Sequence, residues 1–160
     1  PMAIPAWKTA PALAFGNTVV LKPADLVPGS AWALAEIISR SGLPAGAFNL
    51  VMGRGSVVGQ ALLEDARVDA ISFTGSEQTG RGIAITAAQR LAKLQMEMGG
   101  KNPLVVLDDA NLEVAVETTL QGTFYQTGQR CTASSRIIVE RGIYARFRDA
   151  LAQRTSELRV

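Results

Sequence analysis

A repeated alternation of β-branched runs with apolar helical stripes constrains the fold of the first ninety residues. Residues 17–21 form a β-branched run, and Ala31, Leu34 and Ile38 share one face of a helix that begins after Pro28. Two further units of this kind follow, with strands predicted over 48–52 and 70–74 and helices over 57–63 and 77–91. Because each crossover returns the chain in the same direction, three such units predict an α/β fold with a parallel sheet and helices on its faces.

The remainder of the chain continues the alternation after Gly99-Gly100. The pattern predicts a strand over 103–107, a helix over 112–124, a strand over 135–139 and a final helix over 143–151. Either Asp109 or Asn111 could cap the first of these helices, since both side chains can accept a bond from an orphan amide. We therefore expect two parts, residues 1–98 and 99–160, joined at the paired glycines.

Composition excludes several classes of function. Sixteen basic and fourteen acidic residues give a net charge of +2 and are scattered along the chain, so no nucleic-acid partner is expected. The apolar stretch 10–21 is shorter than the about 20 residues that cross a bilayer, so no membrane association is expected. A single cysteine forms no internal disulfide, and no signal-like leader is seen. The sequence thus predicts a cytoplasmic protein.

The chain contains no histidine. This excludes Ser-His-Asp triads, Cys-His dyads and the usual imidazole ligands of a metal, so no metal site is predicted. Acid–base chemistry must therefore use other side chains.

Two glycine-spaced turns follow predicted strands. The turn 75–80 would point backbone amides and a positive helix end at a ligand such as a phosphate. Gly53, Gly55 and Gly59 form a second turn of this kind before another helix. Tight turns without a ligand also use glycine, and either interpretation fits one turn alone. Two such turns at neighbouring strand ends favour a ligand there.

Cys131 and Glu97 are the candidate chemical groups. Cys131 follows the polar segment 127–130, which favours a partly exposed thiol, although a small buried cysteine is the ordinary alternative. A nucleophilic role would require a stabilised thiolate. Glu97 lies among Met96, Met98 and glycines, so it is either a general base or a solvated charge at a strand end.

Four blocks in this order resemble the aldehyde dehydrogenase superfamily, over essentially the whole chain. The blocks are Ala10-Pro11-Ala12-Leu13-Ala14 before Gly16-Asn17-Thr18-Val19-Val20-Leu21-Lys22-Pro23-Ala24, then Phe73-Thr74-Gly75-Ser76, Glu97-Met98-Gly99-Gly100-Lys101 and Gly128-Gln129-Arg130-Cys131. The resemblance implies a Rossmann-like cofactor-binding domain ending near residue 98, followed by the start of the catalytic domain.

The resemblance also implies the roles of individual residues. Cys131 would attack an aldehyde as the thiolate, and Glu97 would activate the water that hydrolyses the thioester. The implied cofactor is NAD or NADP, because the shorter Asp25 stands where glutamate is common and Lys22 could balance a 2′-phosphate. Lys22 as an exposed charge and Asp25 as a loop cap are the alternatives. The implied cofactor-binding residues are Lys22, Asp25, Gly55, Gly59, Thr74, Gly75, Ser76, Thr79 and Gly99.

The resemblance further indicates a fragment. The family's oxyanion-hole asparagine precedes a proline that aligns with Pro1, so we expect the chain alone to be inactive and its parent to be a homo-oligomer. The run 129–136 is similar to enzymes that act on α-ketoglutaric semialdehyde, in which a cationic side chain would suit a charged aldehyde. A nucleotide-binding remnant without chemistry and a coenzyme A-acylating relative are the alternative functions, and Glu97 argues against the second.

Overall fold

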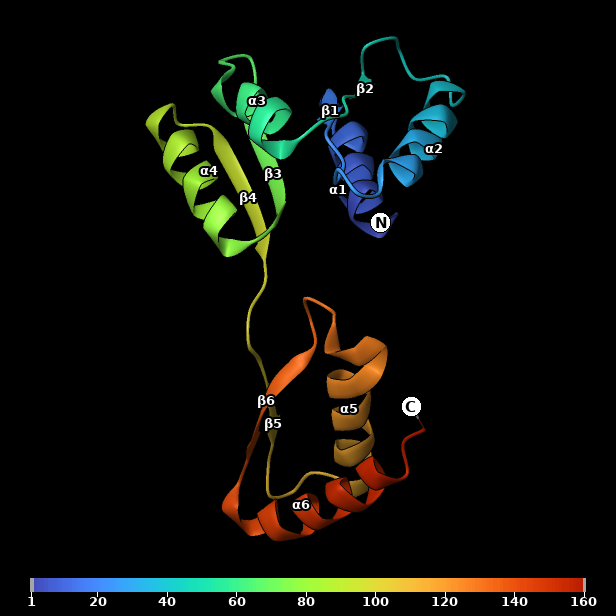
Figure 1. Cartoon of the computed structure of the whole chain (residues 1–160), viewed down its shortest axis with the longest axis vertical. Helices are drawn as coiled ribbons and strands as arrows, with labels where there is room; N and C mark the ends of the chain where they lie inside the picture. The colour runs from blue at the N-terminus through green and yellow to red at the C-terminus, as the bar shows by residue number, and fades with distance from the viewer. Residues whose placement is uncertain (1, 160) are drawn as a thin grey trace. The chain divides into compact units, whose positions relative to one another are not determined.

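The computed structural model describes residues 2–159 and separates into two compact units, one ending at Glu97 and the other beginning at Met98 (Figure 1). Each unit combines strands and helices, which confirms the α/β class. The assignment of the units to cofactor-binding and catalytic domains stays a prediction.

The first unit alternates helices and strands along the chain. Its elements are α1 (Ala3–Ala14), β1 (Val19–Leu21), α2 (Pro28–Ser39), β2 (Phe48–Leu50), the π-helical turn η1 (Gly55–Gly59), α3 (Gln60–Glu64), β3 (Ala70–Gly75), α4 (Glu77–Gln89) and β4 (Lys93–Met98). The three predicted strand–helix units are therefore present, with strands of three to six residues.

The strands of this unit pair two by two. β1 runs parallel to β2, with Val19 opposite Phe48 and Leu21 opposite Leu50, and β3 pairs with β4. We expected one continuous sheet, but no bonds join the two pairs in the part of the chain that the structure describes. Because β1 and β2 have three residues each, they offer few ladder groups for a further neighbour.

Helix α1 was absent from the sequence prediction. Pro5 lies in its first turn, where an amide has no helical partner, and Pro11 lies inside the helix. Two prolines at this spacing normally indicate a segment that does not form a helix, which is why the sequence pattern did not predict α1. Between residues 2 and 159, neither α1 nor any other helix has the length and apolar character needed to span a bilayer.

The second unit has its own hydrophobic core. Its elements are β5 (Asn102–Val106), α5 (Leu112–Phe124), the 3-10 turn η2 (Tyr125–Gly128), β6 (Ser134–Val139) and α6 (Arg141–Ser156). β5 and β6 are parallel, as the strand–helix–strand pattern predicts. The core consists of Val106, Val116, Leu120, Ile143 and Phe147.

Side chains accept hydrogen bonds from backbone amides at the start of both helices in this unit. The Val114 amide donates to the Asn111 side chain at 3.1 Å, so Asn111 rather than Asp109 caps α5. At the start of α6 the Ile143 amide donates to Asp108 at 3.1 Å. Glu140 in turn accepts a bond from the Asp108 amide. These bonds tie the end of β5 to the start of α6.

Candidate active site and cofactor-binding residues

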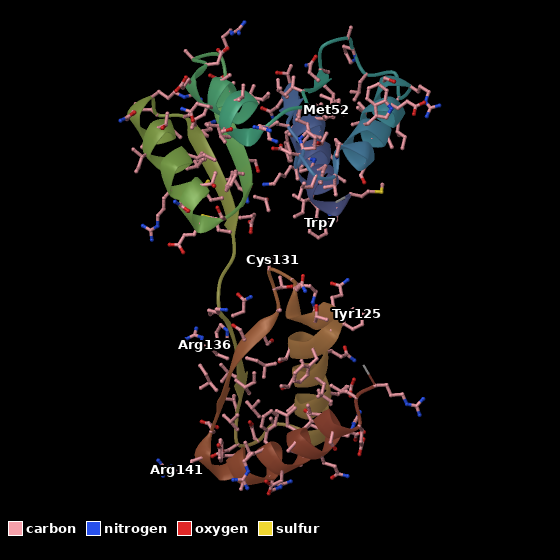
Figure 2. All side chains as sticks on the ribbon, viewed as in Figure 1. Trp7, Met52, Tyr125, Cys131, Arg136 and Arg141 are labelled. Carbon is pink, nitrogen blue, oxygen red and sulfur yellow. The ribbon has the colours of Figure 1, made fainter. Side chains whose placement is uncertain are left out.

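Cys131 is a free, exposed cysteine in the connection between η2 and β6. Residues 125–133, here called the cysteine loop, begin at the C-terminal end of α5, and Figure 2 shows Cys131 at the tip of this loop. The exposure agrees with the polar approach seen in the sequence and argues against a cysteine that only fills space in a core.

The cysteine loop contains three successive residues in the left-handed region. Gln126 and Thr127 both have φ of 54°, and Gly128 has φ of 68°. A β-branched residue such as Thr127 rarely adopts this conformation. At Gly128 a Cβ atom would lie 2.9 Å from the Thr123 carbonyl oxygen, so only glycine fits. The loop is thus held in one unusual shape.

Arg130 points back to helix α5. Its guanidinium donates to the carbonyl oxygens of Gln121 at 2.7 Å and Gly122 at 3.3 Å, and lies 5.5 Å from the centre of the Tyr125 ring. A cation there balances the negative end of the helix and satisfies carbonyls that lack helical partners. Arg130 therefore anchors the loop and is not a free cation for a charged aldehyde.

The start of β5 holds the other side of the cysteine loop. The side-chain amide of Asn102 donates to the carbonyl oxygens of Cys131 at 2.6 Å and Ala133 at 3.1 Å. In return, the Arg136 side chain donates to the Lys101 carbonyl at 3.0 Å. Sequence reasoning missed Asn102, because its partners are backbone groups about thirty residues away and leave no local pattern.

Glu97 lies on β4 within a polar chain of contacts. Gln95 donates to Glu97 at 2.8 Å, and Lys8 of α1 donates to Gln95 at 3.0 Å and to Ser72 at 2.6 Å. Partial burial lowers the pKa of Lys8 from its ordinary value, and the Glu97 charge partly offsets this. Glu97 itself is exposed.

Sequence reasoning also missed Lys8, which belongs to the chain of polar contacts that includes Glu97. Its signal is a single lysine in the otherwise uncharged segment 1–21. Glu97 and Cys131 belong to different units, so their pairing in one reaction stays a prediction.

Lys22, which follows the end of β1, contacts Asp25 and the glycine turn 53–59. Its ammonium donates to Asp25 at 2.8 Å, to the Gly53 carbonyl at 3.2 Å and to the Pro23 carbonyl. A Cβ atom at Gly59 would lie 4.0 Å from the Lys22 Cδ atom. The hydrogen bond from Lys22 lowers the pKa of Asp25 below its ordinary value, with burial as a smaller opposing effect. The structure thus brings Lys22, Asp25 and the glycine turn 53–59 together.

Ser76 begins helix α4 directly after β3. Its hydroxyl accepts a bond from the Thr79 amide at 3.3 Å and lies 2.9 Å from the Thr79 hydroxyl. Thr74, Gly75, Ser76 and Thr79 are all exposed. The positive end of a 13-residue helix is thereby open to an anion, as the turn predicted.

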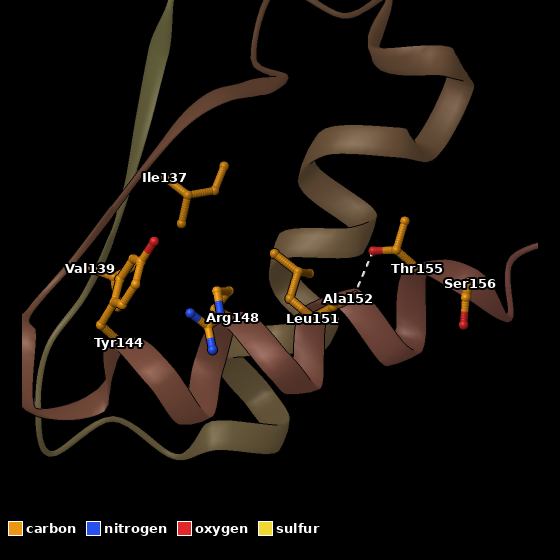
Figure 3. A pocket seen from close by; sticks show the side chains of 8 residues that line it. All are labelled: Ile137, Val139, Tyr144, Arg148, Leu151, Ala152, Thr155 and Ser156. Carbon is orange, nitrogen blue, oxygen red and sulfur yellow. Dashed lines mark hydrogen bonds between the residues drawn. The ribbon is translucent and has the colours of Figure 1, made fainter.

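An apolar hollow lies elsewhere, on the second unit between β6 and α6 (Figure 3). It is lined by Ile137, Val139, Tyr144, Arg148, Leu151, Ala152, Thr155 and Ser156. None of the predicted site residues within 2–159 lines it, so the hollow is not the candidate site. Across that same stretch, acidic and cysteine side chains form no cluster of three that could hold a metal ion.

The fold and these side chains define an α/β protein. It has glycine turns at strand ends, of the kind that bind nucleotides, and an exposed cysteine as the candidate nucleophile. The model of the aldehyde dehydrogenase family matches residues 1–160. The chain is 53% identical over its whole length to the α-ketoglutaric semialdehyde dehydrogenase of Bacillus subtilis and spans 33% of that relative.

Solved structures agree. An NADP-dependent enzyme of Escherichia coli matches 99% of the chain and 33% of its own, with a TM-score of 0.90 and 44% identity. A betaine aldehyde dehydrogenase of Staphylococcus aureus in complex with NAD+ matches 97% of the chain and 31% of its own, with a TM-score of 0.87 and 39% identity. The chain belongs to the aldehyde dehydrogenase family.

Proposed function

We propose that the chain is part of an enzyme that oxidises an aldehyde to a carboxylic acid with NAD or NADP. The observation that carries the proposal is the exposed Cys131 thiol at the tip of a loop anchored at both ends. The chain spans a third of its Bacillus relative, and the isolated chain is proposed to be inactive, with the complete protein a cytoplasmic homo-oligomer.

The residues of the first unit fit a nicotinamide dinucleotide. The exposed amides at the start of α4 suit a diphosphate, and Lys22 with Asp25 offers a donor and an acceptor to a ribose. Gly55, Gly59, Thr74, Thr79 and Gly99 complete the proposed contacts. When bound, the nicotinamide supplies a hydride acceptor.

The protein's own groups supply the remaining chemistry. The Cys131 thiolate attacks the carbonyl carbon and forms a thiohemiacetal, and loss of hydride leaves a thioester on the sulfur. Glu97 takes a proton from water, which attacks the thioester and releases the acid and the thiolate. Gln95 orients Glu97 for this step. The presence of Glu97 favours hydrolysis over transfer to coenzyme A.

We propose a semialdehyde as the substrate class. Support comes from the Bacillus relative, which is named for α-ketoglutaric semialdehyde. The cationic group suggested by the run 129–136 is not Arg130, since α5 engages that side chain.

Turnover by the complete protein tests the proposed reaction. Cys131→Ser is expected to abolish aldehyde-dependent NAD(P)H formation, and Glu97→Gln to slow it by about 10²- to 10⁴-fold through loss of the general base. Glu36→Gln is the matched control, because Glu36 is an exposed carboxylate that pairs only weakly, at 3.6 Å, with Arg40. Full activity of Cys131→Ser would overturn the proposal.

A further inference from the structure

We propose that Asn102 is a positioning residue that sets the direction of the Cys131 thiol. The inference rests on the function proposed above and concerns the backbone on either side of the cysteine. A nucleophile that is displaced by about 1 Å can lose on the order of 10²-fold in rate, so the direction of this side chain matters.

The Asn102 side chain holds two carbonyl groups at once. Its amide nitrogen carries two hydrogens, and it lies 2.6 Å from the Cys131 oxygen and 3.1 Å from the Ala133 oxygen. Ala133 is buried at 8% exposure, so the second bond ties the loop to the body of the unit. Both donors of one amide are therefore used on the cysteine loop.

The side chain acts where the strand ladder is interrupted. Asn102 pairs with Ser134, but Pro103 pairs with Arg136, so Ser135 is passed over. Proline has no amide hydrogen to donate at this step. The side-chain amide of Asn102 supplies two donors just beyond this interruption. The hydrogen bonds of the strand ladder do not hold the cysteine loop there.

Together with a turn, this contact fixes both peptide planes beside Cys131. The Ala133 amide donates to the Arg130 carbonyl at 3.0 Å, and that carbonyl shares a rigid plane with the Cys131 amide. Asn102 fixes the following plane through the Cys131 carbonyl. With both planes held, the Cα–Cβ bond of Cys131 has one direction.

Two variants separate this role from simple packing. Asn102→Asp keeps the size of the side chain but replaces the donating amide with an acceptor that faces two carbonyl oxygens. Asn102→Ala removes the group without adding charge. The matched control is Asn111→Ala in the same unit, which removes the cap of α5 and lowers stability without touching the cysteine loop.

The test is steady-state kinetics of the complete protein, with each variant assayed below its own melting temperature. Both Asn102 variants are expected to lower kcat by about 10- to 100-fold while KM for the nucleotide stays within about twofold. Asn111→Ala is expected to keep kcat. If Asn102→Asp does not fold, the kcat of Asn102→Ala alone tests the positioning role.

Two results would overturn the inference. One is a wild-type kcat in the Asn102 variants, and the other is an equal loss in Asn111→Ala. Cys131→Ser separates the two proposals: if it is inactive while the Asn102 variants are normal, only the positioning role fails. An active Cys131→Ser removes the proposed function itself.

Discussion

Removing the Phe147 ring should strongly destabilise the unit that carries Cys131. Phe147 is 2% exposed and packs in the core with Val106, Val116, Leu120 and Ile143. A Phe→Ala change at such a site costs about 3–5 kcal/mol, which combines the lost transfer free energy with the cavity left behind. The free energy of unfolding of a small domain is about 5–15 kcal/mol, so Phe147→Ala should remove a large share of it.

The chain offers a selective assay for this loss. Both tyrosines, Tyr125 and Tyr144, lie in the second unit, whereas Trp7 and Trp32 lie in the first. Urea unfolding followed by tyrosine near-ultraviolet circular dichroism therefore reports on the unit that holds Phe147. With a slope of about 1–3 kcal/mol per M urea, the midpoint should fall by about 1 M or more.

Phe15→Ala is the matched control for this change. Phe15 is 87% exposed, so its truncation should alter stability by no more than about 0.5 kcal/mol. Equal effects of the two substitutions would refute the assignment of Phe147 to the core.

Two further predictions concern the glycine turn 53–59 and its contact with Lys22. Lys22→Met should raise the pKa of Asp25 towards its ordinary value in a carbon-13 carboxyl titration and weaken NAD(P)+ binding. Because the folded-state pKa of Asp25 is lowered, its stabilising effect exists above the unfolded-state pKa and is lost as the pH falls through the folded-state value. An unchanged titration would contradict the contact. Gly53→Ala should cost about 1 kcal/mol or more, since φ is 145° and the new Cβ would meet Val58 at 2.6 Å. Thermal melts should show a smaller effect for Gly55→Ala, where space is open.

Local patterns predicted most elements of this fold. The four-residue repeat from Leu112 to Phe124 gives α5, and Asn111 has the side chain that caps it. The glycine turns likewise indicated where β2 and β3 end, because glycine is common where the backbone turns tightly. Each of these features depends on residues a few positions apart.

Contacts between distant residues escaped the sequence analysis. The bonds from Asn102 to the cysteine loop and from Lys8 to Gln95 join different elements, and no spacing rule marks them. Arg130 adjoins Cys131 in sequence but extends to α5, which only the path of the chain determines. The pairing of the strands two by two was also not predicted, because strand pairing depends on residues far apart in the sequence.

The proposed covalent chemistry at Cys131 can be tested by measuring the mass of the Cys131 peptide after reaction with an aldehyde. In the complete protein carrying Glu97→Gln, a semialdehyde and NAD(P)+ should leave the acyl group on the Cys131 peptide, because hydrolysis of the thioester is slowed. Cys131 is expected to gain the acyl mass only when both reactants are present. An unmodified Cys131, in a variant that still reduces NAD(P)+, would contradict it.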